Sequence, residues 1–366
     1  MSDRDRHFLQ HTLRLAQRGF GRTSPNPMVG AVLVKKGKII GQGWHHRAGQ
    51  PHAEIEALRA CRESPKGATL FVSLEPCCTH GRTPPCTDAI IAAGVKRVVV
   101  AAVDSNPAHG GRGLELLRKA GISVSSGLLA EAEARLNEAF RHWIVHKTPF
   151  ATVKAAMSLD GKIATRTGES KWITGPAARA YGMTLRTGAD AILVGVNTII
   201  ADNPSLTIRQ AGFEDKQLRR IVLDPSGRIP LRAKVLTDGF SDLTTVVVAG
   251  PVSAALRKRA QVLKAPLRKD GIDLRWLLKK LGREELTSLL VEGGGETNAR
   301  FLLPGLAQRV AFFYAPMVLG GRDAATGVAG EGIAEVADHI ALDDVEYRRL
   351  GADLLLTARI AAATSD

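Results

Sequence analysis

The chain of 366 residues contains no long hydrophobic run. A helix needs about 18 consecutive apolar residues to cross a bilayer, and none of the segments meets that requirement. The first ten residues, MSDRDRHFLQ, are too charged to begin a secretory signal peptide. We therefore expect a protein of the cytoplasm that does not enter a membrane.

Cysteine and aromatic residues are also scarce. The four cysteines are Cys61, Cys77, Cys78 and Cys86, and in a long intracellular chain such cysteines bind a metal or act in catalysis rather than form disulfides. Aromatic residues make up 5%, and the lysines and arginines behind the net charge of +14 are scattered along the chain. Nucleic-acid-binding proteins usually cluster these residues. The charge therefore favours small phosphorylated substrates and no nucleic-acid partner.

The length suggests two domains, and the pattern of apolar residues divides at Thr148–Pro149. Helices and strands alternate before this point. We expect strands 28–35 and 38–44 to form a hairpin that turns at Lys36–Gly37. Further strands are expected at residues 68–73, 95–103 and 122–125, and helices at residues 4–19, 52–62, 86–93, 112–120 and 131–146. Residues 1–147 therefore form a first α/β domain.

Residues 148–366 form a second α/β domain, in which the alternation begins again. The expected strands are residues 150–157, 190–194, 219–223, 244–248, 288–291 and 310–314, with helices between them. The G-x-G-x-x-G pattern of ordinary dinucleotide folds is missing. Gly293–Gly294–Gly295 lies between a strand-like run and a helix-like run. Glycines there let backbone N–H groups approach a phosphate at the helix N-terminus, although such triplets also make ordinary turns.

Three residues at the ends of predicted elements form a candidate zinc site. His52 begins a helix, Cys77 follows a strand, and Cys86 begins another helix. Three protein ligands leave the fourth position of tetrahedral zinc open to a water whose pKa falls towards about 7, which is typical of a catalytic site. Glu54 would then act as general acid/base. This H-x-E plus P-C pattern is typical of zinc nucleobase deaminases, although eight residues rather than two separate Cys77 from Cys86.

The longer motifs around these residues resemble the bifunctional deaminase/reductase family of riboflavin biosynthesis. The motifs are PNPMVGA (residues 25–31), HAE (52–54) and LEPCCTHGRTPPC (74–86). The resemblance implies a cytidine-deaminase-like α/β/α domain. That domain would remove the pyrimidine 2-amino group of 2,5-diamino-6-(5-phosphoribosylamino)pyrimidin-4(3H)-one. It also implies that the substrate is bound by Asn26, His45, His80, Arg82, Asp104 and Asn106, although Asn26 and the segment 104–107 are also typical of plain turns.

The second domain is similar to the reductase half of the same family. The matching motifs are KAAMSLDGK (154–162), SKWIT (170–174), DAILVGVNTIIADNPSLT (190–207) and EGG (292–294). The resemblance covers residues 6 to 320 and implies a dihydrofolate-reductase-like fold that uses NADPH to turn a ribosyl group into a ribityl group. We recognise no site motif after Asp323.

The resemblance also assigns the residues of the reductase site. NADPH would be bound by Ala156, Trp172, Thr198, Asp202, Gly294, Gly295, Glu296, Thr297, Asn298, Ala299 and Arg300. The phosphorylated substrate would be bound by Ser170, Arg186, Leu206, Arg209 and Glu292. The two arginines suit a dianionic phosphate. The candidate proton donors for the opened sugar are Asp202 and Lys154.

Two alternatives share the zinc core. An enzyme that edits a nucleic-acid base would use the positive charge but leaves the second domain unexplained. A non-catalytic module would need a fourth zinc ligand, for which only Cys78 or His80 is at hand. The sequence leaves open whether the chain forms a homo-oligomer.

Overall fold

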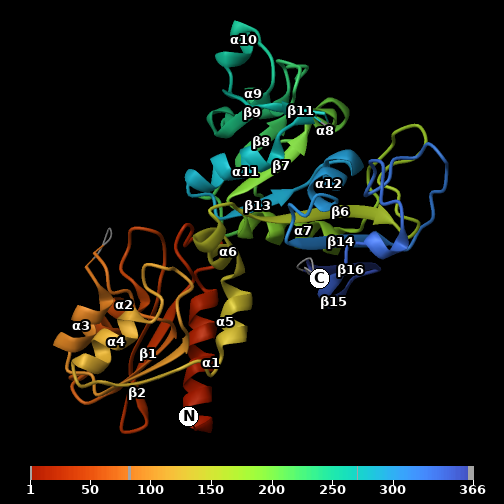
Figure 1. Cartoon of the computed structure of the whole chain (residues 1–366). Coiled ribbons are helices and arrows are strands. Elements are labelled where there is room, and N and C mark those ends of the chain that lie inside the picture. Colours follow the sequence, from red (N-terminus) through yellow and green to blue (C-terminus); the bar gives the residue numbers. More distant parts are fainter. Residues whose placement is uncertain (1, 81–83, 270, 362–366) are drawn as a thin grey trace. The chain divides into compact units, whose positions relative to one another are not determined.

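The computed structural model describes residues 2–80, 84–269 and 271–361. The chain folds into two compact units, Met1–Lys147 and Thr148–Asp366. Figure 1 shows the two units, each built around its own sheet. The division falls where Thr148–Pro149 interrupts the alternation of helices and strands.

The first unit contains a five-stranded sheet in the order β2-β1-β3-β4-β5. The strands β1, β2 and β3 pair antiparallel, whereas β3, β4 and β5 are parallel. Its elements are α1 (Asp3–Gln17), β1 (Gly30–Lys35), β2 (Lys38–Trp44), α2 (Ala53–Arg59), β3 (Thr69–Leu74), α3 (Cys86–Ala92), β4 (Arg97–Ala102), α4 (Arg112–Lys119), β5 (Ser123–Ser126), α5 (Ala130–Leu136) and α6 (Glu138–His146). The predicted strands of this half are confirmed to within about two residues, the usual error of element boundaries.

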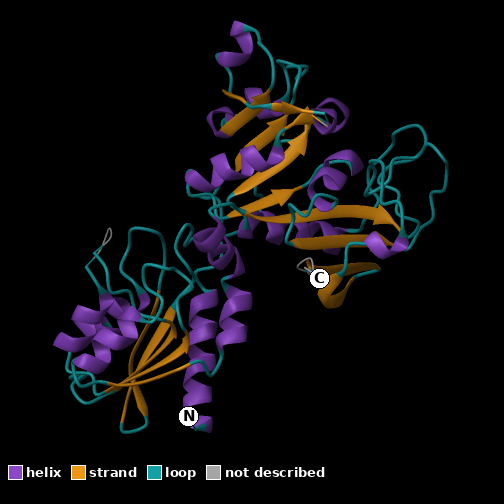
Figure 2. Ribbon diagram, viewed as in Figure 1, coloured by secondary structure: helices purple, strands orange, loops and turns teal. Residues whose placement is uncertain are grey.

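Helices cover both faces of this sheet, as Figure 2 shows. Successive residues of a strand point to opposite faces. Ala31 and Leu33 of β1 accordingly join a core cluster with α2, α3 and α4. Val32 and Val34 join a second cluster with residues of α1. The sheet is thus buried on both sides, and the expected α/β/α layering results.

The predicted hairpin turn is confirmed at Lys36–Gly37. Both residues have positive φ angles, 46° and 80°. Two left-handed residues in succession make the type I′ turn that matches the twist of the two strands, and a glycine adopts this conformation without strain.

The prediction of a single helix over residues 131–146 is wrong, because α5 and α6 are separated at Asn137. This residue has φ −109° and ψ 27°, outside the helical range. Its amide accepts from Met28 N at 2.7 Å and donates to Met28 O at 2.9 Å. Asparagine favours such side-chain bonds to the backbone over the helix interior. The break therefore fixes the segment that leads into β1.

The second unit contains a nine-stranded sheet in the order β10-β9-β8-β7-β13-β6-β14-β16-β15. Its elements are β6 (Phe150–Ser158), α7 (Pro176–Gly188), β7 (Ala191–Gly195), α8 (Val196–Asp202), β8 (Arg219–Leu223), α9 (Lys234–Thr237), β9 (Thr244–Val248), α10 (Ala254–Arg257), β10 (Gln261–Lys264), β11 (Leu267–Arg268), β12 (Gly271–Ile272), α11 (Leu274–Arg283), β13 (Ser288–Val291), α12 (Gly295–Leu302), β14 (Arg309–Ala315), β15 (Leu342–Leu350) and β16 (Asp353–Ile360). The six strands predicted here are confirmed. Strands β10 to β12 and the hairpin of β15 and β16 were not predicted.

Seven neighbouring strands of this sheet are parallel, namely β10, β9, β8, β7, β13, β6 and β14, and β16 and β15 add an antiparallel edge. Strands β11 and β12 form a separate antiparallel pair. Core clusters lie on both faces: one includes residues of α11 and α12, and the other residues of α8. The carboxyl ends of β6, β7 and β13 meet at one edge, where ligands gather in sheets of this kind. Within the described residues, no helix is long and apolar enough to span a membrane.

Candidate active sites

The three predicted metal ligands meet at one point of the first unit. His52 caps the N-terminus of α2, Cys86 is the first residue of α3, and Cys77 follows the end of β3. His52 Nδ1 lies 3.2 Å from Cys86 Sγ and 3.5 Å from Cys77 Sγ. The three ligand atoms all lie within 4.8 Å of one another. Two helix starts and one strand end therefore bring together one nitrogen and two sulfur atoms.

This geometry fits zinc. With Zn–S bonds of about 2.3 Å and Zn–N bonds of about 2.0 Å, the edges of a tetrahedral site measure about 3.5 Å from N to S and about 3.8 Å from S to S. The two N···S distances are close to this edge. Among the described residues the group of ligand atoms has three members. Neither Cys78 nor His80 belongs to it, so the fourth ligand that a structural zinc site needs is missing from this part of the chain.

The neighbouring thiols of Cys77 and Cys86 shift each other's pKa in opposite directions. A hydrogen bond with the Cys86 thiol, together with one to His52, lowers the pKa of the Cys77 thiol. The same hydrogen bond raises the pKa of Cys86. The backbone N–H of Cys86 also donates to Cys77 Sγ at 3.3 Å. Cys77 is therefore prepared as a thiolate, the form that zinc binds.

Glu54 lies beside the cluster and is 3% exposed. It projects from the first turn of α2, two residues after His52, and forms a hydrogen bond with the Cys86 thiol. Burial raises the pKa of Glu54 to about 7, although the charge of His52 opposes the shift. A divalent cation at the three ligands would lower this pKa again. The side chain can thus take up and release a proton near neutral pH.

Two further predicted residues lie next to His52. The ring of His45 stands 5.4 Å from the ring of His52, at an interplanar angle of 84°. His45 Nδ1 lies 3.1 Å from the carbonyl oxygen of Pro51, which can only accept, so this nitrogen carries the hydrogen. His45 Nε2 then accepts from Asn26 Nδ2 at 3.1 Å. Burial lowers the pKa of His45, in agreement with a neutral ring that orients Asn26.

Three further predicted residues of this site are described, namely Asp104, Asn106 and His80. Asp104 and Asn106 lie in the loop after β4, where their carboxylate and amide oxygens accept from Asn106 N at 2.8 Å and Ala108 N at 3.0 Å. They therefore stabilise their own turns. His80 is exposed, and Arg82 lies outside the described residues.

The reductase candidates include a buried charge cluster. Arg186 of α7 donates from Nε to Glu292 Oε1 at 2.8 Å and from Nη2 to Oε2 at 2.9 Å. Lys154 Nζ lies 3.8 Å from Glu292 Oε2. Attraction to Arg186 and Lys154 outweighs burial and lowers the pKa of Glu292 to about 2. Glu292 is therefore a carboxylate. It interacts with both Arg186 and Lys154, and Arg186 is the closer partner.

Lys154 and Ala156 lie on the same face of β6, because they are two residues apart in a strand. Both are half-buried, whereas Val153, Ala155 and Met157 on the opposite face are buried. The face of β6 that carries Lys154 is therefore less completely covered than the opposite face, although Ala156 packs against a small apolar cluster.

A second group of predicted residues gathers around the end of α8. Ser170 Oγ donates to Asp202 Oδ1 at 3.2 Å, and Lys171 Nζ lies 3.4 Å from the same oxygen. Thr198 lies one turn earlier on this helix. Trp172 is 68% exposed, and the Arg179 guanidinium lies 4.6 Å from its ring centre. Trp172 is therefore not part of the hydrophobic core.

The glycine triplet does begin a helix, as predicted, with Gly294 as the N-cap of α12. A side chain at Gly293 would place its Cβ 2.4 Å from Thr297 Cβ, so only glycine fits there. A Cβ at Gly195, which ends β7, would lie 2.9 Å from Thr297 Oγ1. An added Cβ at Gly294 meets nothing within 4 Å. The ends of β7 and β13 therefore converge on an open helix N-terminus.

Several predicted residues turn their side chains elsewhere. The Leu206 side chain is buried in the core, so only its backbone atoms could contact a ligand. Asn298 Nδ2 donates to Gly327 O at 2.8 Å, Ala299 is buried, and the Arg300 guanidinium donates to Ile272 O. Glu296 is exposed, and its Oε1 accepts from Gly330 N at 3.4 Å. Arg209 is exposed.

The Asn298 side chain offers a test of whether this region can hold NADPH. Its Oδ1 is buried without a hydrogen-bond partner in the described structure, so an acceptor is left over beside the glycine triplet. A free acceptor and an open helix N-terminus fit a ligand that carries both phosphates and amide or hydroxyl donors.

Asp160 was not predicted as a site residue, although it lies within the motif at residues 154–162. Its carboxylate accepts from Ser158 Oγ at 2.6 Å, Leu319 N at 3.1 Å and Gly320 N at 2.7 Å. It therefore ties the segment after β14 to the end of β6. Two of its partners lie far away in sequence, and no local pattern reveals them.

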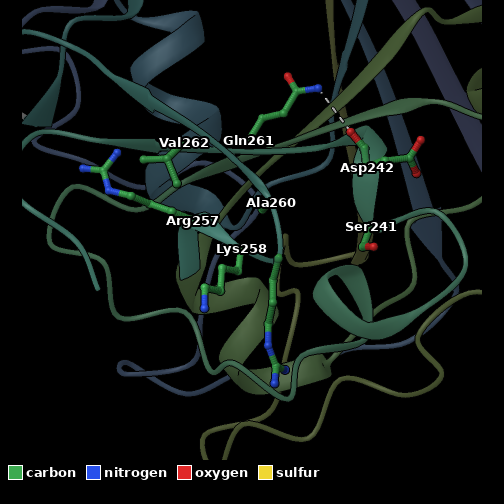
Figure 3. A pocket seen from close by; sticks show the side chains of 8 residues that line it. Ser241, Asp242, Arg257, Lys258, Ala260, Gln261 and Val262 are labelled. Atoms are coloured by element: carbon green, nitrogen blue, oxygen red, sulfur yellow. Dashed lines mark hydrogen bonds between the residues drawn. The ribbon is translucent and has the colours of Figure 1, made fainter. Parts of the chain in front are cut away.

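A cavity of about 540 Å³ lies at the edge strand β10. Figure 3 shows that Arg257, Lys258 and Gln261 surround it, and Gln261 Nε2 donates to Asp242 O at 3.2 Å. None of the predicted site residues lines it. We therefore separate it from the reductase site.

Comparisons with known proteins agree with these two sites. The RibD C-terminal domain matches residues 149–356, and the cytidine and deoxycytidylate deaminase zinc-binding region matches residues 2–102. The riboflavin biosynthesis protein RibD of Aquifex aeolicus is 44% identical over 96% of this chain and 97% of its own length. The chain belongs to the RibD family.

Other relatives agree with the assignment. RibD of Escherichia coli is 40% identical over 96% of this chain and 98% of its own. The structure of Acinetobacter baumannii RibD has a TM-score of 0.90 at 36% identity and covers 98% of this chain and 99% of that one. A Thermotoga maritima structure, described as a diaminohydroxyphosphoribosylaminopyrimidine deaminase/5-amino-6-(5-phosphoribosylamino)uracil reductase, has a TM-score of 0.87 at 34% identity, with the same coverage.

Family membership confirms the expected fold and function class. The chain has a cytidine-deaminase-like domain followed by a RibD-type, dihydrofolate-reductase-like domain. It is a bifunctional enzyme of riboflavin biosynthesis, with a zinc-dependent deaminase and an NADPH-dependent reductase. The nucleic-acid-editing and non-catalytic alternatives give no role to the second domain.

Proposed function

We propose that the first domain deaminates 2,5-diamino-6-(5-phosphoribosylamino)pyrimidin-4(3H)-one. The second domain then reduces the ribosyl group of 5-amino-6-(5-phosphoribosylamino)uracil to ribityl with NADPH. The observation that carries the proposal is the pairing of two sites in one chain: His52, Cys77 and Cys86 with Glu54, and Lys154 with Glu292 and Arg186. The Thermotoga maritima relative, described as a deaminase and reductase of these compounds, supports the choice of substrates.

In the deamination, His52, Cys77 and Cys86 would hold zinc, which when bound activates a water for attack on the pyrimidine carbon. Glu54 accepts the proton that the water loses. It then delivers a proton to the amino group, and the C–N bond breaks as ammonia leaves. Asn26, oriented by His45, donates or accepts at the pyrimidine edge. Asp104 and Asn106, with His80 and Arg82, complete the substrate pocket.

In the reduction, opening of the ribose ring turns its ring oxygen into a hydroxyl and leaves a C=N bond at the sugar carbon, which would take up a hydride from bound NADPH. Lys154 Nζ delivers the proton to the nitrogen of this bond. Arg186 uses two donors on Glu292 and a third on Thr207 O at 3.2 Å. Lys154 is therefore the less tightly held cation, and its N–H groups stay available to a ligand. Asp202 forms an ion pair with Lys171 and accepts a hydrogen bond from Ser170. We therefore assign it to cofactor binding and not to proton donation.

The other reductase residues bind the two ligands. The backbone N–H groups of Gly294, Gly295 and Glu296 lack intrahelical partners at the start of α12 and face the cofactor phosphates. Ala156, Trp172, Thr198, Asp202 and the turn from Thr297 to Arg300 complete the cofactor site. Arg209, which is exposed, takes the substrate phosphate, while Ser170, Arg186, Leu206 and Glu292 position the sugar.

We also propose that the enzyme works in the cytoplasm, where its zinc-binding cysteines stay reduced.

We further propose that the enzyme self-associates through β15. This edge strand pairs with β16 on one side, and its residues 342–349 are exposed, with Leu342, Val345 and Tyr347 among them. A long exposed edge strand with apolar side chains is an aggregation hazard unless another strand covers it. Sedimentation of the wild type and of Tyr347→Lys tests this: the wild type should be a dimer or larger, and the variant should dissociate.

The substitution Glu54→Gln tests the proposed deaminase. It keeps the shape of the side chain and removes the acid/base group. We expect ammonia release to fall by about 10²- to 10⁴-fold, with zinc still bound and the reduction of pre-deaminated substrate unchanged. Glu56→Gln, on the same helix but partly exposed beside Arg59, is the control and should remain active. Full deamination by Glu54→Gln would refute the assignment.

A further inference from the structure

The zinc-binding end of β3 lies beside the start of a substrate-pocket loop. Strands β3 and β4 are parallel, and Leu74 at the end of β3 pairs with Ala102 at the end of β4. The chain continues from β3 through Glu75 and Pro76 to Cys77. From β4 it continues into the loop 103–111, which carries Asp104 and Asn106. Both segments therefore leave the sheet at the same edge.

Glu75 connects the two segments. Its Oε2 accepts from Asp104 N at 3.1 Å and from Gly111 N at 2.9 Å. Its Oε1 accepts from Gly113 N at 2.9 Å. The side chain is 5% exposed, so these three backbone groups replace water around a buried carboxylate. One side chain thus fixes both ends of the loop 104–113.

Two further contacts connect this loop to the segment that follows β3. An added Cβ at Gly113 would lie 2.3 Å from the backbone oxygen of Pro76, so the start of α4 packs directly on Pro76 and only glycine fits. Cys78 Sγ lies 3.6 Å from His109 Nδ1 in the middle of the loop. The loop is therefore attached to residues on both sides of Cys77.

We propose that Glu75 is a positioning residue for deamination, which holds the loop 104–113 at a fixed place relative to the zinc ligand Cys77. This inference rests on the proposed function, in which Asp104 and Asn106 line the substrate pocket. The internal turns of Asp104 and Asn106 set the shape of the loop, and Glu75 sets its location. Loss of the Glu75 carboxylate leaves the zinc ligands in place and displaces the substrate-binding wall.

The test is Glu75→Gln, which replaces one of the two acceptor oxygens with an NH₂ group that faces backbone N–H groups. We expect the KM for the diaminopyrimidine phosphate to rise by about tenfold to a hundredfold, the range that a lost hydrogen bond to a charged group gives. The kcat should stay within about twofold, and zinc content and the reductase rate should not change. Glu115→Gln, exposed on α4, is the matched control.

Gly113→Ala tests the same contact without a change of charge. Its Cβ pushes the loop away from Pro76, so the KM should rise as it does in Glu75→Gln. Hydrogen exchange gives a readout that needs no substrate: in Glu75→Gln the amides of Asp104, Gly111 and Gly113 should lose protection. A lower melting temperature with unchanged KM and unchanged protection would overturn the inference. Absence of ammonia release by the wild type would instead contradict the proposed function, and the exchange result would still decide the role of Glu75.

Discussion

Arg186 holds Glu292 by two parallel hydrogen bonds, from Nε to Oε1 at 2.8 Å and from Nη2 to Oε2 at 2.9 Å. The Arg186 side chain is 15% exposed and the Glu292 side chain 10%. A buried ion pair of this kind contributes little to stability compared with apolar side chains, because both charges lose their hydration. What the pair provides is a fixed carboxylate next to Lys154.

The first prediction concerns Arg186→Met, which leaves Glu292 buried without its main partner. Removal of one member of a buried pair costs about 3 to 5 kcal/mol. We expect the reductase domain to unfold at lower urea concentration and NADPH oxidation to be lost, while the deaminase stays active. Arg257→Met, an exposed arginine at the remote cavity, is the control. A normal rate of NADPH oxidation by Arg186→Met would show that the role of Glu292 in reduction does not require the ion pair with Arg186.

The second prediction concerns the acid stability of the same pair. Burial raises the pKa of Glu292, but Arg186 and Lys154 outweigh burial and bring it to about 2, against an ordinary value of 4.5. Because the folded-state pKa is the lower one, the stabilisation is complete above 4.5 and is lost as the pH falls towards 2. The free energy of unfolding of the reductase domain, measured with urea, should therefore fall as the pH is lowered across this window. The fall should be less steep in the double variant Arg186→Met/Glu292→Gln. Equal pH dependence of the two proteins would contradict a stabilising ion pair.

The third prediction separates the two candidate proton donors. Lys154→Met should lower the kcat of reduction by about 10²-fold or more, because proton transfer contributes that much to catalysis, while NADPH still binds. Asp202→Asn should mainly weaken binding, since Asp202 is already paired with Lys171 and Ser170. Steady-state kinetics and NADPH titration on both variants measure the difference. A larger fall in kcat for Asp202→Asn would reverse the assignment.

The fourth prediction concerns metal removal. Three protein ligands form a catalytic zinc site, whereas a structural site needs four. Chelation should therefore abolish ammonia release and leave the circular dichroism spectrum and the reductase rate largely unchanged. Zinc should restore deamination. Global unfolding on chelation would instead indicate a structural metal.

Local patterns predicted much of this molecule. Lys36–Gly37 requires a tight turn, and His52, Cys77 and Cys86 stand at element boundaries, so the hairpin and the ligand group could be found from the sequence. The central strands are apolar runs, which are recognisable because both of their faces are buried. The edge hairpin was missed because β15 is exposed along nearly its whole length and carries many charges.

Long-range hydrogen bonds account for what was missed at the sites. Asn137 leaves the helix to bond Met28, which is 109 residues away in sequence. Glu75 and Asp160 bind backbone N–H groups, which every residue except proline offers, so no sequence pattern reveals their partners. The Arg300 guanidinium likewise donates to a backbone oxygen, that of Ile272, which no sequence pattern reveals.

The most direct test of the two-site account is incubation of the wild-type enzyme with 2,5-diamino-6-(5-phosphoribosylamino)pyrimidin-4(3H)-one, with and without NADPH. We expect ammonia release without NADPH, because the zinc site works alone. NADPH oxidation should begin after ammonia release and reach the same molar amount. NADPH oxidation that precedes ammonia release, or no ammonia release without NADPH, would contradict the account.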